Sequence, residues 1–211
     1  MTETTARIVL VILWSALAVI RLYYSRLGGA FSPAARRSSS TSREGTAVVV
    51  VRLLMIPWLV VVGVYLFAPD RLGRFQLDLP GWLRWLGACA WLTSLALLLW
   101  VHRALGRNFS GLLRTRDDHE LVTWGPYRWV RHPMYPTFLL LATGMFLLTA
   151  HWLIGVPPFL GVALVMAFRT PLEEAMMVER FGDEYRSYAA SVGRYLPRFG
   201  AGGRAGVAES P

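Results

Sequence analysis

The chain contains no lysine, so all 22 of its basic residues are arginine. This absence excludes chemistry that proceeds through a lysine Schiff base or a lysine general base. Cysteine is nearly absent too, because Cys89 is the single one and lies within an apolar segment. One cysteine allows neither an intrachain disulfide nor a cage of thiolate ligands, and the four histidines are not paired at metal-ligand spacing. We therefore predict no metal site.

Charged residues are scarce and apolar ones abundant. The 211 residues are 55% hydrophobic and 17% charged, with a mean hydropathy of +0.42, values that indicate an integral membrane protein. The net charge of +9 would also suit nucleic acid. However, the arginines lie in blocks between apolar segments, where membrane topology alone accounts for them, and no basic, aromatic-interleaved binding module is visible. We therefore expect a membrane and no nucleic acid as partner.

Five apolar segments have the composition of membrane helices. The last two are joined by almost no loop, which predicts an antiparallel hairpin, with Pro157 and Pro158 kinking or delaying the start of its second helix. The fold class predicted is all-α integral membrane, with five transmembrane helices. These segments cover approximately residues 8–24, 47–68, 82–101, 138–150 and 153–168.

The distribution of arginine predicts the orientation in the membrane. Arginines are concentrated in the first and third connections and in the tail, whereas the second connection balances Arg71 and Arg74 with Asp70 and Asp78. The positive-inside rule then places the N-terminus outside and the C-terminus in the cytoplasm. Abundant alanine, glycine and arginine without lysine are typical of a GC-rich bacterial genome, so we expect a bacterial inner membrane.

The chain divides into three parts by composition. Residues 1–104 form the predicted three-span region, which includes a mobile cytoplasmic loop at 28–45 rich in serine, glycine and arginine. Residues 105–199 contain the hairpin and most of the chemically interesting side chains. Residues 200–211 are predicted to be a disordered tail.

One segment after the last predicted span has an amphipathic pattern. Spacings of four, four and three residues place Met177, Phe181, Tyr185 and Tyr188 on one face of a helix. Charged residues occupy the other faces. The pattern predicts a cytoplasmic amphipathic helix along the membrane surface, covering residues 125–135.

Two polar clusters flank the predicted hairpin. Because the open ends of a helical hairpin are neighbours, these clusters are expected to converge on one side of the membrane. Gly125 before Pro126 permits a tight turn there. The first cluster is His119, Tyr127, Arg131, His132 and Tyr135, and the second is Arg169, Glu173 and Glu174.

Such a site suits a ligand that carries an anion, a cation and a flat group. A guanidinium binds a carboxylate with two hydrogen bonds, and carboxylates accept from an ammonium or from ribose hydroxyls. Aromatic faces attract a sulfonium by about 0.5 to 2 kcal/mol. S-adenosylmethionine carries all these groups, although other zwitterions fit as well. The alternative is structural, with Arg131 and Trp129 as interface anchors and the glutamates paired to nearby arginines.

Three stretches resemble the isoprenylcysteine carboxyl methyltransferase family and its phospholipid methyltransferase relatives. They are LGRNFS at 105–110, HELVTWGPYRWVRHPMY at 119–135 and RTPLEEAMMVERFGDEYRSYAASVGRYLP at 169–197, which cover about the C-terminal half. The resemblance implies a multi-span enzyme that binds S-adenosylmethionine in a cytoplasmic pocket closed by the C-terminal segment. An amphiphilic acceptor, which is an isoprenoid carboxylate, a thiol or a lipid, would then enter from the bilayer.

The resemblance also implies roles for particular residues. Arg131 matches an arginine that orients the acceptor or polarises the reacting group, so Arg131 and Glu174 are the candidate catalytic residues. One departure is Pro136, where relatives often have glycine. The positions that match the surroundings of the methyl donor are His119, Leu121, Gly125, Tyr127, His132, Pro133, Tyr135, Glu173 and Glu174.

Two other functions are compatible with parts of the sequence. An NADPH-dependent membrane sterol or steroid reductase shares a His-Pro-x-Tyr element, but it must hold phosphates where this chain has Glu173 and Glu174. A membrane scaffold or lipid-binding protein would explain the amphipathic helix and the arginine-rich face. For a methyltransferase, a carboxylate or thiolate acceptor needs no general base, whereas an amine would need one such as Glu174 or His132.

Overall fold

The computed structural model describes residues 1–27, 46–106 and 120–198. The predicted loop at 28–45, the predicted tail at 200–211 and His119 lie outside these described residues. Helices make up most of the described part of the chain. Their bounds are α1 Glu3–Leu27, α3 Thr46–Phe67, η2 Pro69–Phe75, α4 Gly81–Leu105, η4 Gly125–Arg128, α5 Met134–Thr149 and α6 Trp152–Ser191, where η denotes a 3₁₀-helix.

The predicted class of all-α integral membrane protein is confirmed, while the number of five spans stays a prediction. By length and composition α1, α4 and α6 can each cross a membrane. A fourth span results if Leu53–Phe67 and Pro69–Phe75, which meet at a bend of 113°, are counted as one. Helix α5 has 16 residues, fewer than the roughly 20 of a typical membrane helix.

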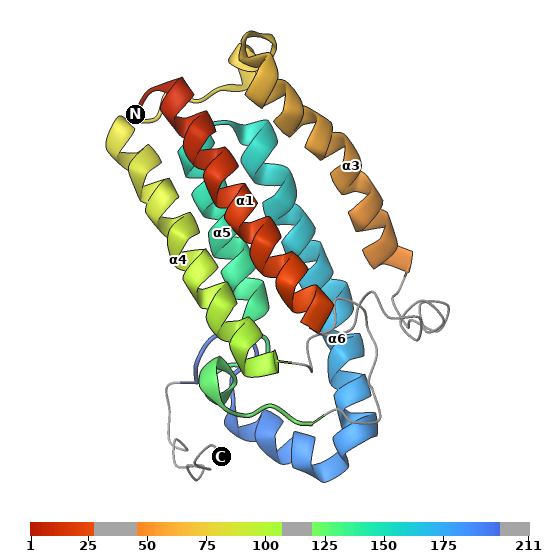
Figure 1. Ribbon diagram of the computed structural model, residues 1–211. Coiled ribbons are helices and arrows are strands. Elements are labelled where there is room, and N and C mark those ends of the chain that lie inside the picture. The colour runs from red at the N-terminus through yellow and green to blue at the C-terminus, as the bar shows by residue number, and fades with distance from the viewer. Residues whose placement is uncertain (28–45, 107–119, 199–211) are drawn as a thin grey trace.

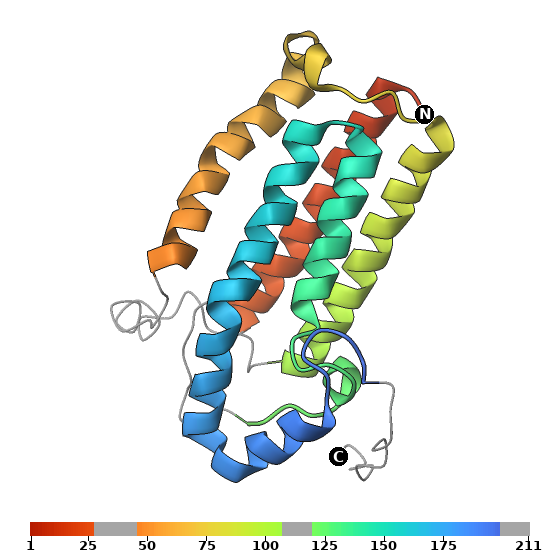
Figure 2. The same ribbon diagram turned by 180° about the vertical axis from the view of Figure 1, so that it is seen from behind.

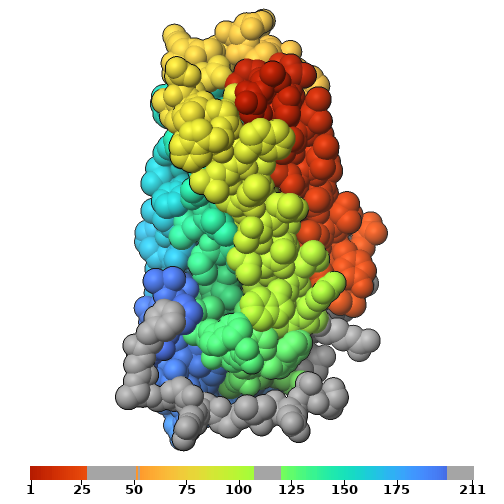
Figure 3. Space-filling view, turned by 90° about the vertical axis from the view of Figure 1, so that its left-hand side faces the viewer, coloured from red at the N-terminus to blue at the C-terminus, as the bar shows by residue number. Residues whose placement is uncertain are grey.

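The long helices form a bundle around one apolar core. Figures 1 and 2 show α1, α4, α5 and α6 side by side, with α3 at the edge, where it packs on α6. Leu10, Trp91, Leu98, Met145 and Ile154 are almost completely buried between these helices. In Figure 3, α4 runs along the whole face between α1 on one side and α5 with α6 on the other. Large apolar side chains of the helices remain exposed on the outside, as expected for surfaces in contact with lipid.

Two glycines allow α4 and α5 to touch through their backbones. A Cβ on Gly87 would lie 2.5 Å from the amide nitrogen of Leu148, and one on Gly144 would lie 2.8 Å from the carbonyl oxygen of Gly87. Real Cβ atoms do not approach a backbone so closely. Small residues at this crossing therefore set the distance between the two helices.

The predicted hairpin is confirmed, since only Ala150 and His151 separate α5 from α6. Ala150 adopts a left-handed conformation, with φ of 52°, which reverses the chain directly after α5. Helix α6 begins at Trp152 and runs through Pro157 and Pro158. The two prolines therefore do not delay its start.

Helix α6 continues from the predicted last span into the predicted amphipathic segment, without the separation after Phe168 that the sequence predicts. The helix is interrupted at Gly182, where φ is 55° and ψ is −125°, a conformation that favours glycine. Figure 1 shows the C-terminal part of α6 turning beneath the bundle at this end. The amphipathic pattern itself holds, because Tyr185 is buried and Met177 and Tyr188 are half-buried, whereas Glu184 is exposed.

A polar cluster that the sequence did not predict closes the opposite end of the bundle. The guanidinium of Arg84, which is 5% exposed, forms a 2.6 Å ion pair with Glu3 and donates to the carbonyl oxygen of Leu148 at 3.0 Å. Tyr65 and Gln76 also donate to the Glu3 carboxylate. Helices α1, α3 and α4 are thereby joined far from the predicted site.

Candidate functional site

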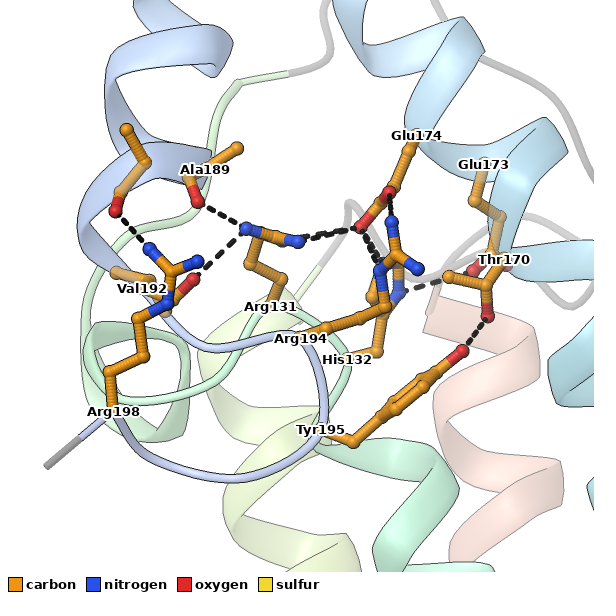
Figure 4. A network of polar contacts seen from close by, with 11 residues as sticks. Arg131, His132, Thr170, Glu173, Glu174, Ala189, Val192, Arg194, Tyr195 and Arg198 are labelled. Atoms are coloured by element: carbon orange, nitrogen blue, oxygen red, sulfur yellow. Dashed lines mark hydrogen bonds and ion pairs between the residues drawn. The ribbon is translucent and has the colours of Figure 1, made fainter.

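The two predicted clusters meet at one end of the hairpin, as expected. The Nε atom of Arg131, just before α5, lies 3.2 Å from Oε1 of Glu174 in α6, and its Nη2 atom lies 3.1 Å from the same oxygen. Figure 4 shows these two side chains within a larger network of polar contacts. The convergence that the hairpin predicts is therefore confirmed.

Two adjacent glutamates, Glu173 and Glu174, form the centre of the site and are called the carboxylate pair. Besides Arg131, Glu174 accepts from Arg194, whose Nε atom is 3.1 Å and Nη2 atom 2.6 Å away. Glu173 accepts from Nε of Arg169 at 2.7 Å and from the Tyr135 hydroxyl at 3.1 Å. Each carboxylate thus has several donors.

His132 connects the carboxylate pair. Its Nδ1 atom lies 3.3 Å from Glu173, and its Nε2 atom lies 3.3 Å from Glu174. Only the imidazolium form donates from both ring nitrogens, because a neutral ring carries one N–H. Both ring nitrogens of His132 thus face a carboxylate.

The surroundings of the carboxylate pair keep both groups ionised at neutral pH. Residues 152–168 of α6 carry no charge, and 40 residues extend about 60 Å, so the pair lies beyond the part that fits a bilayer core of about 30 Å. Burial alone would raise the pKa of Glu174, but the hydrogen bond from Arg194 and the charge of Arg131 lower it below its usual value. For Glu173, burial is likewise outweighed by His132 and Arg169, which lower its pKa.

Residues 192–198, called the C-terminal strap, lie across the site. The amides of Arg131 and His132 donate to the carbonyl oxygens of Gly193 at 2.8 Å and Arg194 at 3.0 Å, so the strap runs beside residues 130–132 in parallel. The Tyr195 hydroxyl donates to Thr170 at 2.9 Å. The strap is therefore fixed both to the entrance of α5 and to α6.

Arg131 contacts backbone groups at the start of the strap in addition to Glu174. Its Nη1 atom donates to the carbonyl oxygens of Ala189 and Val192. Together with the contacts of Nε and Nη2 to Glu174, all three guanidinium nitrogens have a partner. Its side chain is only 10% exposed, so Arg131 contacts Glu174 from the buried side of the site.

Aromatic rings surround the carboxylate pair. The ring centroids of His132, Tyr135 and Tyr195 are 5.9 to 6.3 Å apart. The Tyr188 hydroxyl donates to the carbonyl oxygen of Tyr127 at 2.7 Å, which joins η4 to the end of α6. Burial raises the pKa of the Tyr127 phenol, and nearby Tyr188 and Glu173 raise it further, so this phenol stays neutral.

The remaining predicted residues lie in or beside η4 and at the start of α5. Gly125 has φ of +61°, and a Cβ there would lie 3.2 Å from Ala104 at the end of α4, so glycine fits both the conformation and the space. Pro133 is the buried N-cap residue of α5. Leu121 is half-buried in the segment that leads to η4. His119 lies outside the described residues.

Sequence reasoning missed Thr170, Arg194 and Tyr195. The residues GRYLP lie within the stretch that carries the family resemblance, but no spacing rule connects them to α6. Among the described residues, no group of three or more His, Cys, Asp or Glu side chains is arranged to hold a metal ion.

Together, the fold and the site define a helical membrane protein in which a hairpin brings two carboxylates and several cations together at one end. Residues 86–179 match the model of the Isoprenylcysteine carboxyl methyltransferase (ICMT) family. This region of the chain is similar to that family, which confirms the resemblance.

Individual relatives match the same region. A "Probable protein-S-isoprenylcysteine O-methyltransferase" of Oryza sativa subsp. indica is 37% identical over 94 residues, which are 44% of this chain and 49% of the relative. The "Protein-S-isoprenylcysteine O-methyltransferase" of Homo sapiens is 34% identical over 94 residues, 44% of this chain and 33% of the relative. The chain thus spans about half of the former and a third of the latter.

A solved structure has a similar fold. It is the "eukaryotic intramembrane Ras methyltransferase ICMT (isoprenylcysteine carboxyl methyltransferase) without a monobody", with a TM-score of 0.56 and 22% sequence identity. The match covers 87% of this chain and 65% of that one. It extends beyond the region of sequence similarity and shows that the helical arrangement is shared.

Proposed function

We propose that the protein is an S-adenosylmethionine-dependent methyltransferase that acts on a hydrophobic or amphiphilic acceptor reached from the bilayer. The observation that carries this proposal is the carboxylate pair, held with Arg131, His132 and Arg194 at the end of a membrane hairpin. This arrangement lies within the region that is similar to a methyltransferase family, or directly beside it.

The residues present fit the chemical groups of this donor. The carboxylate pair is suited to accept from an ammonium or from ribose hydroxyls, and a guanidinium is suited to a carboxylate. Tyr135, Tyr195 and Tyr127 provide aromatic faces beside the charged groups, which favour a sulfonium and a flat base. The predicted donor-binding residues remain proposals in these roles.

When bound, S-adenosylmethionine supplies a methyl group attached to a sulfonium, and the thioether that remains after transfer is a good leaving group. The task of the protein is then chiefly to hold donor and acceptor in line, which lowers a barrier by up to about 7 to 11 kcal/mol. Glu174 is the proposed contact to the donor, while Arg131 keeps Glu174 and the strap in place. The covering strap and the half-buried aromatic residues limit the access of water to this site.

The acceptor is proposed to be an isoprenoid carboxylate, a thiol or a lipid. The relatives are named for methylation of S-isoprenylcysteine, and a carboxylate or thiolate acceptor requires no general base. If the acceptor were an amine, Glu174 or His132 would be the candidate base. A reductase is disfavoured, because the ionised carboxylate pair would repel the phosphates of NADPH.

We further propose five membrane spans in a bacterial inner membrane, with the N-terminus outside and the site in the cytoplasm. A tilted or locally thinned bilayer accommodates a short helix such as α5. In this arrangement residues 1–104 are the three-span part, 105–199 the methyltransferase part and 200–211 the tail.

Transfer of a labelled methyl group tests the proposed activity. Purified protein in detergent is incubated with isotope-labelled S-adenosylmethionine and a membrane lipid extract, and the products are analysed by mass spectrometry. Wild-type protein is expected to label a lipid-soluble product. Arg131→Ala and Glu174→Ala are expected to abolish labelling, while Arg186→Ala, a change at an exposed residue, retains it. Binding of NADPH without binding of S-adenosylmethionine would instead favour the reductase.

A further inference from the structure

Three guanidinium groups contact the carboxylate pair, and they differ in exposure. The side chains of Arg131 and Arg169 are 10% and 12% exposed, whereas that of Arg194 is 51% exposed. All three guanidinium nitrogens of Arg131 have a partner. Arg194 uses only Nε and Nη2, and within the described residues its Nη1 atom donates to no other group. Arg194 is therefore the cation that a small molecule can reach most easily.

The backbone of Arg194 is fixed although its side chain is exposed. Its carbonyl oxygen accepts from the amide of His132 at 3.0 Å. Its neighbours on the strap are held independently, since Gly193 pairs with Arg131 and Tyr195 binds Thr170. The guanidinium can therefore shift towards a ligand without release of the strap.

The arginines and glutamates of the site together carry a net positive charge. Arg131, Arg169 and Arg194 carry three positive charges against the two negative charges of Glu173 and Glu174. A carboxylate placed beside Arg194 therefore meets an excess of positive charge.

We infer that Arg194 binds the carboxylate at the amino-acid end of the methyl donor, beside Glu174, which accepts from the ammonium of the same end. This inference rests on the proposed function. The ammonium and the carboxylate of an α-amino acid are attached to one carbon, so their binding site must present opposite charges side by side. Nη2 of Arg194 lies 2.6 Å from Oε2 of Glu174, and Figure 4 shows the two side chains facing each other. Arg131 then positions Glu174 from beneath and does not meet the ligand.

An acceptor with its own carboxylate is the other possible source of this anion. The two sources place different demands on Arg194. If the anion belongs to the donor, loss of Arg194 changes how strongly the protein distinguishes a donor analogue with a carboxylate from one without it. If the anion belongs to the acceptor, that discrimination is unaffected and only the KM for the acceptor rises.

The decisive measurement is equilibrium binding of two thioethers to the full chain in detergent. One is S-adenosylhomocysteine, and the other is its analogue that keeps the amine but lacks the carboxylate. Wild-type protein is expected to prefer S-adenosylhomocysteine by about tenfold to a hundredfold, as for a hydrogen bond between charged groups. In Arg194→Gln the preference is expected to fall close to onefold, and in Arg194→Lys to an intermediate value.

Tyr195→Phe is the matched control on the same strap. It removes the bond to Thr170 without a change of charge, so it is expected to weaken both thioethers equally and to keep the wild-type preference. Thus a general loosening of the strap is distinguished from the loss of a carboxylate-binding group.

Each remaining outcome is decisive. A wild-type protein that binds both thioethers equally, or an Arg194→Gln variant that keeps the wild-type preference, overturns the inference while the methyltransferase proposal stands. The inference is also overturned, with the methyltransferase proposal intact, if Arg194→Gln raises only the KM for an S-farnesyl cysteine probe. If wild-type protein binds neither thioether, the proposed function itself fails. If Arg194→Gln does not fold, the inference is tested by the preference of the wild-type protein and by whether Arg194→Lys lowers that preference.

Discussion

Charged side chains at the site are stabilised by several partners each, and the removal of one partner affects the others. Glu174 accepts from Arg131, His132 and Arg194. A carboxylate that is only 17% exposed is costly unless cations and hydrogen bonds compensate for lost water. The same contacts that keep Glu174 ionised therefore hold the strap over the site.

At the residue scale, Arg131→Ala is expected to release the strap. The change leaves the carbonyl oxygens of Ala189 and Val192 without this donor and should destabilise the fold by about 1.5 to 3 kcal/mol. Thermal unfolding in detergent and limited proteolysis of residues 192–198 measure the two effects. Arg186→Ala, which removes an exposed pair with Asp183, should change stability by less than about 0.5 kcal/mol. Equal unfolding temperatures for the two variants would contradict this role of Arg131.

A second residue-scale prediction concerns pH. The pKa of Glu174 is lowered in the folded protein, so the contribution of its ion pairs is fully present above the ordinary carboxyl pKa of about 4.5. It is lost as the pH falls through the lower folded pKa, because protonation then removes the negative charge. Proteolysis of the strap is expected to be slow at neutral pH and to accelerate only below pH of about 4.5.

Glu174→Gln is the control for this pH response. The variant cannot ionise at this position, so its strap should already be susceptible to protease at neutral pH. The steep increase on acidification should be smaller than in the wild type. An identical pH profile for both proteins would show that another group controls the strap.

The sequence predicted some of these residue contacts and missed others for a clear reason. Arg131 and Glu174 were predicted to be neighbours because they lie at the two ends of one hairpin. Arg194 and Arg84 were missed, since their partners Glu174 and Glu3 follow no periodic pattern and depend on how distant segments pack. Contacts between a strap and a helix are tertiary, and a single sequence gives no spacing for them.

At the scale of elements, the crossing of α4 and α5 determines where the entrance of α5 lies. Gly87→Ala and Gly144→Ala are expected to separate the two helices, because each new Cβ would meet backbone atoms within 3 Å. The expected loss of stability is about 1 to 3 kcal/mol for each, measured by thermal unfolding in detergent. Gly63→Ala is the control, since nothing lies within 4 Å of a Cβ there. A loss of stability as large in the control would contradict the explanation.

Helix α6 was only partly predictable. The sequence predicts a membrane helix at about 153–168 and a separate amphipathic helix after it. In the structure the helix continues past Phe168 and is interrupted at Gly182. The apolar pattern predicted each half correctly because it depends on local spacing. It could not reveal that hydrogen bonding continues between them.

At the scale of the whole molecule, polar groups occupy both ends of the apolar bundle. Glu3 and Arg84 close one end, and the carboxylate pair occupies the other. In Figure 1 the N-terminal end of α1 and the C-terminal part of α6 lie at these opposite ends. From an odd number of spans and the distribution of arginine, we propose that the carboxylate pair faces the cytoplasm. This orientation is a prediction of the sequence.

The orientation is tested by labelling of introduced cysteines. Cys89 is exposed and is the single native cysteine, so it is first replaced by serine. Asp70→Cys and Arg186→Cys then each place one thiol at an exposed position near opposite ends of the bundle. In sealed right-side-out vesicles, an impermeant maleimide is expected to label position 70 directly and position 186 only after permeabilisation. The reverse pattern would place the site outside.

The unbroken course of α6 from Trp152 to Gly182 has a mechanical consequence. Because one part of this helix is apolar and suited to lipid and a later part carries the carboxylate pair, tilt and axial rotation of the helix move the carboxylates as well. One inserted residue after Phe168 would turn Glu173 and Glu174 by about 100° away from Arg131. A bilayer that changes the tilt of α6 through its thickness moves these carboxylates as well, so the lipid surroundings and the geometry of the site are coupled.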